Sequence, residues 1–98
     1  MSYEWDAAKD ANNRRKHGLS LAEAIPALED PNRYFWTDDR FDYDEERTIT
    51  LGRNQQSLLV VVSTEKLRTE THEEEIIRII SVRKAVKLET DWYYLGRT

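Results

Sequence analysis

The spacing of apolar and polar residues divides the chain into a helical first third and a strand-rich remainder. Tyr3–Trp5 is short and aromatic, and it predicts a brief strand. The carboxylate of Asp6 can accept amide protons at the start of a helix, and Gly18 suits the left-handed position that commonly ends one. These two residues predict a helix over residues 7 to about 17.

A second helix is predicted directly after the first. Ser20 and Glu23 have the S-x-x-E spacing of a capping box, in which side chains satisfy amides at the start of a helix. Pro26 cannot donate an amide proton and should strain or kink this helix. The helix should end near Glu29, because residues 30–32 read Asp-Pro-Asn, a turn signal.

From residue 33 onward the pattern changes to the period of two that is typical of strands. Ile49 and Leu51 alternate with threonines, and Arg47 shares their parity. The β-branched run Ser57–Thr64 predicts a central strand. Further strands are predicted at residues 33–37 and 76–82, and polar connections at 38–45, 52–56 and 66–75.

Residues 83 to about 95 contain no helix breaker and predict a closing helix. The expected fold class is therefore α+β. It has two N-terminal helices, an antiparallel sheet of three or four strands and a C-terminal helix, with the helices on one face of the sheet. A chain of 98 residues is expected to form a single domain over residues 1–98.

Composition excludes several classes of protein. The absence of Cys rules out disulfides and Cys-ligated zinc, and the two His residues lack metal-ligand spacing, so no metal or cofactor is expected. The longest apolar run, Leu58–Val62, is much shorter than the roughly 20 residues of a membrane-spanning helix. The first residues lack the basic start and apolar stretch of a signal peptide, so we expect a cytoplasmic protein.

The formal net charge of −4 conceals a strong segregation of charge. Residues 38–46 hold six acids and one Arg, and residues 70–75 hold four acids. The remaining residues carry 14 basic and nine acidic side chains, with basic clusters at 9–17 and 78–87. Such clusters can attract phosphate even on an acidic chain, although solvated helix faces produce the same pattern.

Several cationic residues are candidates for a phosphate site. Lys16 and His17 come at the end of the first predicted helix, where they either complement the helix dipole or bind a phosphate and exchange a proton. Arg47 is an even number of positions from Ile49 and Leu51, so it is expected on the same apolar face of the strand. It therefore either pairs with a carboxylate or faces an anion at the sheet edge, because an unpaired buried charge is costly.

Arg78 and Arg83 come close together near the end of the last predicted strand. Two guanidinium groups there can form a fork for a phosphate. Ion pairing, for instance with Glu46 or Glu65, is the competing interpretation.

The aromatic residues also have two interpretations. They can fill the core of a chain with few large aliphatic residues, or they can stack on unpaired RNA bases. Trp5 stands out because it lies beside the basic helix that carries Arg14 and Arg15.

Taken together, these segments resemble the BrnT family, the ribonuclease toxins of type II toxin–antitoxin pairs. The resemblance runs from Tyr3 to about Tyr93. Its anchors, in chain order, are Tyr3-Glu4-Trp5-Asp6 with Lys9; Asn13 with Lys16-His17-Gly18; Ser20 with Glu23-Ala24; Glu46-Arg47 leading to Gly52; Val60-Val61-Val62 with Thr64-Glu65; Arg78-Ile79-Ile80-Ser81 with Arg83 and Ala85; and Glu89 with Tyr93.

The resemblance implies a fold similar to the RelE-like toxins and an endoribonuclease activity that arrests growth. It also implies a BrnA-type antitoxin encoded beside the toxin, a two-plus-two assembly, and DNA binding through the antitoxin. Compared with the family, this chain has a longer segment at residues 66–75 and a more acidic composition.

On this basis we predict metal-independent RNA cleavage, in which a ribose 2′-hydroxyl attacks the neighbouring phosphate. Lys16, Arg78 and Arg83 would supply positive charge. His17 would carry the proton, with Glu46 or Glu65 as the competing base. The predicted site comprises Lys16, His17, Arg47, Arg78 and Arg83 for catalysis, Trp5, Arg14, Arg15 and Tyr93 for RNA binding, and no metal.

A non-catalytic binding module is the alternative hypothesis. The same basic groove could hold an acidic segment of an antitoxin, or an RNA, without cutting it. The acidic segments at 38–46 and 70–75 could also block the groove, so that activity is lost.

Overall fold

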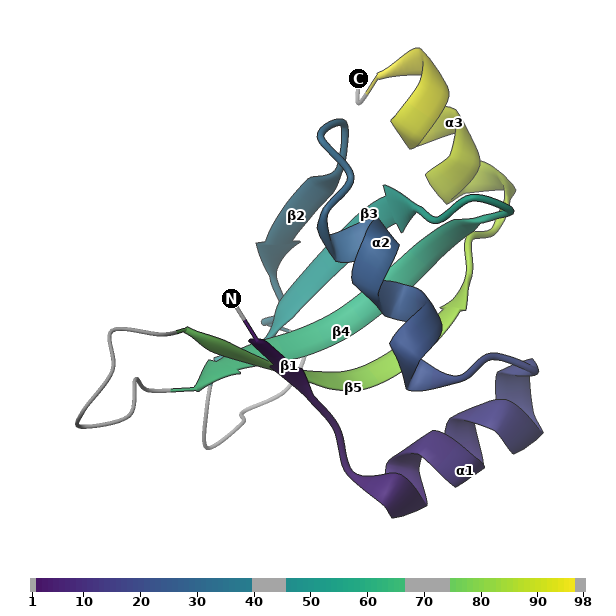
Figure 1. Cartoon of the computed structure of the whole chain (residues 1–98). Helices are drawn as coiled ribbons and strands as arrows, with labels where there is room; N and C mark the ends of the chain where they lie inside the picture. Colours follow the sequence, from purple (N-terminus) through teal and green to yellow (C-terminus); the bar gives the residue numbers. More distant parts are fainter. Residues whose placement is uncertain (1, 40–45, 67–74, 97–98) are drawn as a thin grey trace.

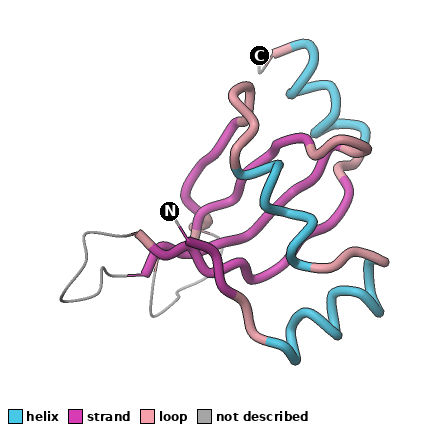
Figure 2. The backbone as a smooth tube through the Cα atoms, in the orientation of Figure 1, coloured by secondary structure: helices cyan, strands magenta, loops and turns pink. Residues whose placement is uncertain are grey.

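The computed structural model describes residues 2–39, 46–66 and 75–96 (Figure 1). Within these ranges the chain forms an α+β fold on a five-stranded sheet (Figure 2). In chain order the elements are β1 (Ser2–Glu4), α1 (Ala7–His17), the 3₁₀-helix η1 (Leu21–Ala24), α2 (Ile25–Leu28), β2 (Tyr34–Thr37), β3 (Thr48–Arg53), β4 (Leu58–Lys66), β5 (Ile76–Lys84) and α3 (Lys87–Leu95). The predicted polar connections at 38–45 and 66–75 lie mostly outside the described residues.

The strand order in the sheet is β1-β5-β4-β3-β2. The prediction of a central strand at Ser57–Thr64 is confirmed, because β4 lies in the middle. The prediction of an antiparallel sheet of three or four strands is wrong in the number of strands and in the direction of one strand. Among the described residues there are five strands, and β1 runs parallel to β5. That pairing joins the N-terminal strand to the strand that comes last in the chain, and no local sequence pattern predicts it.

The first predicted helix is confirmed at both ends. The backbone amide of Lys9 donates to the Asp6 carboxylate at 3.0 Å. Gly18 has φ of 71°, and its amide donates to the Arg14 carbonyl at 2.9 Å. The left-handed conformation at Gly18 turns the chain toward the sheet.

The second predicted helix forms, with a different geometry. The Ser20 amide donates to the Glu23 carboxylate at 2.7 Å, as a capping box requires. The first turn is 3₁₀, and α2 then covers only Ile25–Leu28. Pro26 does not kink a long helix. It stands in the first turn of α2, where an amide proton has no partner within the helix.

The sheet buries apolar side chains on both faces. Leu59 and Val61 of β4 belong to a core cluster with η1 and α2. Leu58 and Val60 point to the other face, into a cluster that includes Trp92 of α3. The prediction that all helices lie on one face is therefore wrong. A central strand that is apolar at successive positions needs cover on each side.

The closing helix starts later than predicted. Residues 83–84 still belong to β5, where Arg83 pairs with Val60 and Lys84 with Leu59. The helix α3 begins at Lys87, and the Val86 amide donates to the Glu89 carboxylate at 2.9 Å. The longer strand keeps Arg83 on the sheet rather than on the helix.

Candidate active site

A pocket of about 430 Å³ lies on the α3 face of the sheet. We call it the central pocket. Its lining comes from α1, four strands and α3, with the titratable and aromatic side chains on α1, β2, β5 and α3. Its described lining residues are His17, Trp36, Ile49, Val60, Val62, Ser81, Val82, Arg83, Glu89 and Trp92.

An ion pair stands in the wall of the central pocket. Both terminal nitrogens of Arg83 donate to the two Glu89 carboxylate oxygens, at 2.8 and 2.7 Å. These hydrogen bonds hold the pKa of Glu89 below its ordinary value, with burial acting in the opposite direction. Glu89 is therefore a carboxylate at neutral pH and a poor proton acceptor. The Arg83 side chain is 40% exposed, so a ligand can approach it.

His17 reaches the central pocket because α1 is tied to β5. Asn13 is buried, and its amide nitrogen donates to the carbonyls of Leu19 and Val82, at 2.9 Å each. Its side-chain oxygen accepts from the Val82 amide at 3.1 Å. His17 follows Asn13 by four residues and so lies on the same face of the helix. Anchoring Asn13 to Val82 therefore brings His17 next to Arg83.

A bulge interrupts the pairing of β4 with β5. Val62 pairs with Ser81, whereas the next residue, Ser63, pairs with Ile79. The strand β5 thus carries one extra residue, Ile80, at this point. Such a bulge changes which face the following side chains point to.

The bulge brings Arg78 to the same face as Arg83. In a regular strand, residues five positions apart point to opposite faces. One extra residue between them restores a common face. The core supports this reading, because Ile79 and Val82, three positions apart, belong to the same cluster on the opposite face.

Arg78 and Arg47 lie in a second row beside the central pocket. Arg78 pairs with Thr64 in the sheet and donates to the Glu4 carboxylate of β1 at 3.0 Å. Continuing the β3–β4 register by one residue places Arg47 opposite Thr64. Arg47 is half-buried and precedes an interior strand, so the alternative that places it at the sheet edge is wrong. The guanidinium groups at 47, 78 and 83 therefore belong to one face of the sheet.

The remaining cations of α1 lie outside the central pocket. Lys16 is exposed next to His17 but does not line the pocket. Arg14 pairs with Asp10 at 3.1 Å, and Arg15 donates to Asn12 at 3.1 Å, both on the helix surface. The end of α1 thus contributes His17 to the pocket and leaves its neighbours in solvent.

The predicted stacking residues Trp5 and Tyr93 lie apart from the central pocket as well. Trp5 is 37% exposed, in the connection between β1 and α1. Tyr93 is part of the α3-side core, and its hydroxyl donates to the Asp30 carboxylate at 2.6 Å. Neither residue lines the pocket.

The predicted site does not include the aromatic walls of the pocket, Trp36 and Trp92, or Glu89, the acidic partner of Arg83. The rings of Trp36 and Trp92 meet edge to face at 6.4 Å. Sequence patterns could not bring them together, because they come from β2 and α3. Glu89 could have been found, since it occupies the third position of the closing helix and can cap it. Glu46 and Glu65 are the examples given for the competing ion-pair interpretation; in the structure Arg78 pairs with Glu4 and Arg83 with Glu89. The side chain of Glu65 lies outside the described part of the chain.

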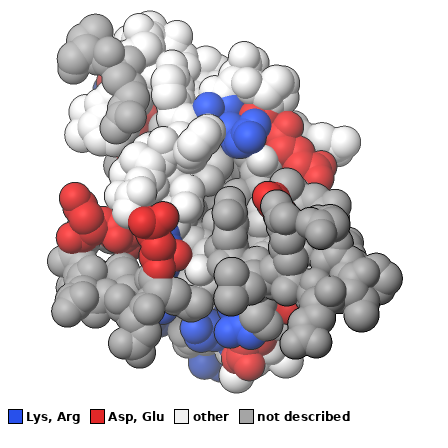
Figure 3. Space-filling model, turned by 90° about the vertical axis from the view of Figure 1, so that its left-hand side faces the viewer, with Lys and Arg blue, Asp and Glu red and all other residues white. Residues whose placement is uncertain are grey.

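One face of the described surface carries basic and acidic side chains close together. On the face in Figure 3, blue basic side chains lie beside red acidic ones.

Among residues 2–39, 46–66 and 75–96, no group of three His, Asp or Glu residues is placed to hold a metal ion. In the same residues, no helix is long and apolar enough to cross a membrane.

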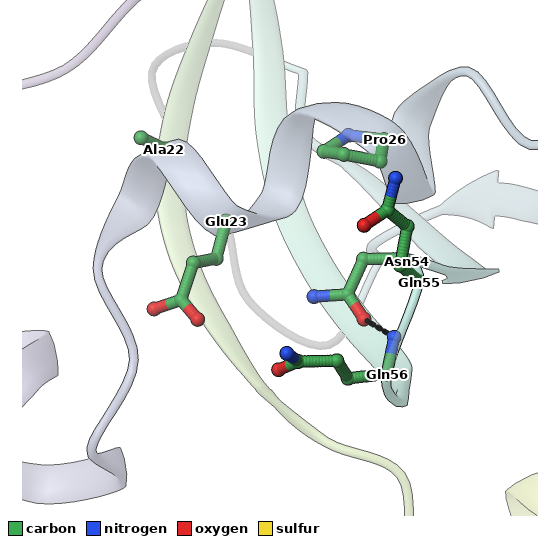
Figure 4. Close-up of a pocket in the computed structure, with 6 residues that line it drawn as sticks. All are labelled: Ala22, Glu23, Pro26, Asn54, Gln55 and Gln56. Carbon is green, nitrogen blue, oxygen red and sulfur yellow. Dashed lines mark hydrogen bonds between the residues drawn. The ribbon is translucent and has the colours of Figure 1, made fainter.

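Another hollow, of about 260 Å³, lies between η1, α2 and the turn from β3 to β4 (Figure 4). Figure 4 shows the amide side chains of residues 54–56 facing Glu23 and Pro26. The Glu23 carboxylate already accepts a hydrogen bond in the capping box. The Asn54 side-chain oxygen accepts from the backbone amide of Gln56 at 2.8 Å. The described lining contains no Lys, Arg or His, so this hollow does not suit a phosphate.

Comparison with known proteins identifies the chain. A search of curated proteins finds no match. The family model for the ribonuclease toxin BrnT of type II toxin–antitoxin systems matches residues 5–89. That range contains His17, Arg83 and Glu89 and therefore the titratable side chains of the central pocket. The chain belongs to the BrnT family of ribonuclease toxins of type II toxin–antitoxin systems, and such a toxin has an antitoxin as its partner.

Proposed function

We propose that this toxin cleaves RNA at the central pocket without a metal ion. The proposal rests on one observation, which is that the side chains of His17 and Arg83 line the same pocket. Two tryptophan rings form part of its walls. This set offers a proton acceptor, a fixed positive charge and flat apolar surfaces for bases. Those are the groups that internal cleavage of RNA requires.

The reaction is an attack by a ribose 2′-oxygen on the adjacent phosphorus. His17 accepts the proton of the 2′-hydroxyl, the new O2′–P bond forms, and the P–O5′ bond breaks. The 5′-oxygen takes a proton from water, which leaves a 2′,3′-cyclic phosphate and a 5′-hydroxyl. Arg83 stabilises the negative charge that develops on the non-bridging oxygens. Arg78, Arg47 and Lys16 hold flanking phosphates.

Glu89 would position Arg83 for this role. A two-point ion pair restrains the guanidinium plane and its direction at the mouth of the pocket. The cost is that a carboxylate stands close to the phosphate. We propose that the phosphate binds at the exposed side of Arg83 and leaves the ion pair in place.

The test is cleavage of single-stranded RNA by the purified toxin in EDTA. We expect activity without magnesium, and products that end in a cyclic phosphate. Arg83→Ala and His17→Ala should each lower kcat by about 100-fold or more, because each removes a group that acts in the transition state. The matched control is Lys87→Ala, which removes an exposed cation that is paired with Asp91 on α3.

Two results would contradict this proposal. One is cleavage that requires magnesium. The other is near-normal kcat in both pocket variants, with circular dichroism spectra that match the wild type.

The family membership supports further proposals about the assembly. We propose that the chain is a single domain with a RelE-like fold that acts in the cytoplasm. A BrnA-type antitoxin would neutralise it in a two-plus-two complex and bind DNA for both. Co-expression with the neighbouring gene, followed by light scattering of the purified complex, tests the stoichiometry.

A non-catalytic binding module is the second candidate. The ion pairs of Arg83 with Glu89 and of Arg78 with Glu4 favour it, because both guanidinium groups already hold a carboxylate. Expression of the chain alone and with the neighbouring gene separates the two candidates. Growth arrest and RNA breakdown in the chain alone support the nuclease, and unchanged growth in both cases supports the binding module.

A further inference from the structure

A third hollow, of about 510 Å³, lies near the C-terminal end of α3. We call it the tyrosine hollow, and its described lining residues are Asn32, Tyr34, Arg53, Tyr93 and Tyr94. We propose that the tyrosine hollow binds a base of single-stranded RNA beside the cleavage site. This inference rests on the proposed nuclease function and extends it to a second nucleotide subsite.

The walls of the tyrosine hollow are held in place before any ligand binds. The buried Asp30 carboxylate accepts hydrogen bonds from the Tyr93 hydroxyl at 2.6 Å and from the Arg53 amide at 2.8 Å. Tyr93 then meets Tyr34 edge to face, with ring centroids 6.3 Å apart, and Tyr94 at 4.9 Å. Rigid aromatic walls reduce the entropy that binding costs.

The hollow also presents a stacking surface and a positive charge to solvent. Tyr94 is 55% exposed. The Arg53 guanidinium carbon lies 6.0 Å from the Tyr94 ring centre, and the guanidinium donates to the Tyr94 hydroxyl. An aromatic face next to an arginine is the combination that binds unpaired bases together with their phosphates.

The tyrosine hollow is adjacent to the central pocket along two elements. On β2, Tyr34 lines the hollow and Trp36 lines the pocket, two positions apart on the same face. On α3, Tyr93 lines the hollow and Trp92 lines the pocket. A strand of RNA can therefore occupy both sites at once.

Single-stranded RNA fits this lining better than a protein segment does. The described lining of the hollow is aromatic, amide or cationic and has no aliphatic side chain. A volume of about 510 Å³ also falls within the roughly 300–1,000 Å³ of small-ligand sites. Both features suit a base with its phosphate.

The experiment compares RNA substrates of two lengths. A dinucleotide occupies only the central pocket, whereas an octanucleotide also reaches the tyrosine hollow. Tyr94→Ala and Arg53→Gln should each reduce the kcat/KM advantage of the octanucleotide over the dinucleotide by about tenfold, the typical loss for one stacked base. Tyr94→Phe keeps the ring and should keep the advantage. Leu88→Ala, an exposed position on α3 outside both sites, is the control.

Binding of a 2′-O-methyl octanucleotide separates this inference from the nuclease proposal, because that RNA cannot be cleaved. If the wild type cleaves no RNA but Tyr94→Ala and Arg53→Gln weaken octanucleotide binding about tenfold, the nuclease proposal fails and the subsite stands. If both variants keep the length advantage and wild-type binding, the subsite proposal is overturned. Loss of antitoxin binding in the same variants would then identify the hollow as a protein contact.

Discussion

At the scale of single residues, the side chains of Asn13, Tyr3 and Tyr93 make hydrogen bonds whose contribution to the free energy of unfolding can be measured. Asn13 ties the first helix to the last strand of the sheet, with hydrogen bonds to Val82 that span 69 positions of the chain. Tyr3 and Tyr93 each donate to a carboxylate, Glu29 and Asp30 respectively. All of these contacts join parts of the chain that are distant in sequence.

Replacing Asn13 by Ala should lower the free energy of unfolding by about 2–3 kcal/mol, because buried backbone groups lose their partners. The neighbouring variant Asn12→Ala is the matched control, since Asn12 accepts only a surface hydrogen bond from Arg15 among its described contacts. Urea denaturation measures both. Equal stability losses in the two variants would contradict this account of Asn13.

Stability should fall as the pH rises from 10 toward 12. Burial raises the pKa of Tyr3 and of Tyr93 from 10 to about 12, and the carboxylate that accepts from each hydroxyl adds to the shift. The folded chain therefore holds these protons more tightly than the unfolded chain. Their contribution is fully present below pH 10 and is lost as the pH passes through 12.

Urea midpoints across this range test the prediction. Tyr93→Phe should be less stable at neutral pH, because the hydrogen bond to Asp30 is lost, but its stability should fall less steeply between pH 10 and 12. Identical slopes in the wild type and the variant would show that Tyr93 does not titrate with a raised pKa.

At the scale of elements, two backbone features set the geometry around the sheet. The bulge at Ile80 turns Arg78 to the face of the central pocket. On the opposite face, α2 packs directly on β3, where a Cβ on Gly52 would overlap the Ala27 carbonyl oxygen and lie 3.0 Å from its carbonyl carbon. Gly52 is therefore needed for close approach of two backbones.

Gly52→Ala should lower the free energy of unfolding by about 1–3 kcal/mol, because the backbone of α2 must move to accept a methyl group. Adding Ala27→Gly should not rescue the variant, since the overlap is with the main chain and not with the Ala27 side chain. Thermal unfolding of the single and double variants decides this. Recovery in the double variant would locate the clash in the side chain instead.

At the scale of the whole molecule, one face of the sheet gathers a histidine and several arginines that are dispersed along the chain. His17 and Arg83 share the central pocket, and Arg47 and Arg78 lie in the row beside it. An acidic chain can thus present a local site for an anionic polymer, with carboxylates such as Glu4 and Glu89 restraining the arginines.

This arrangement predicts a moderate salt dependence of RNA binding. Contacts of Lys16, Arg47, Arg78 and Arg83 with phosphates at the cleavage site should give a slope of about −3 in a plot of log K against log salt concentration, at about −0.7 per contact on single strands. Arg78→Gln should reduce the slope by about 0.7 in magnitude. Titration of a 2′-O-methyl RNA measures it, with Lys87→Gln as the control. An unchanged slope in Arg78→Gln would remove Arg78 from the phosphate contacts.

The sequence by itself determined the local structure of this protein. Asp6 and Gly18 delimit the first helix, and the Ser20–Glu23 spacing starts the next, because capping depends on residues a few positions apart. The β-branched run Ser57–Thr64 located the central strand, because strand propensity is also a property of a short segment. The ordered motifs also identified the family, which the match to residues 5–89 confirms.

Only the tertiary structure decided which side chains meet. The parallel pairing of β1 with β5 and the placement of α3 on the opposite face from α2 depend on contacts between distant segments. So does the site: one extra residue in β5 selects the face of Arg78, and α3 brings Glu89 to Arg83. Strand register and long-range packing are properties of the whole fold, and a pattern along one segment does not contain them.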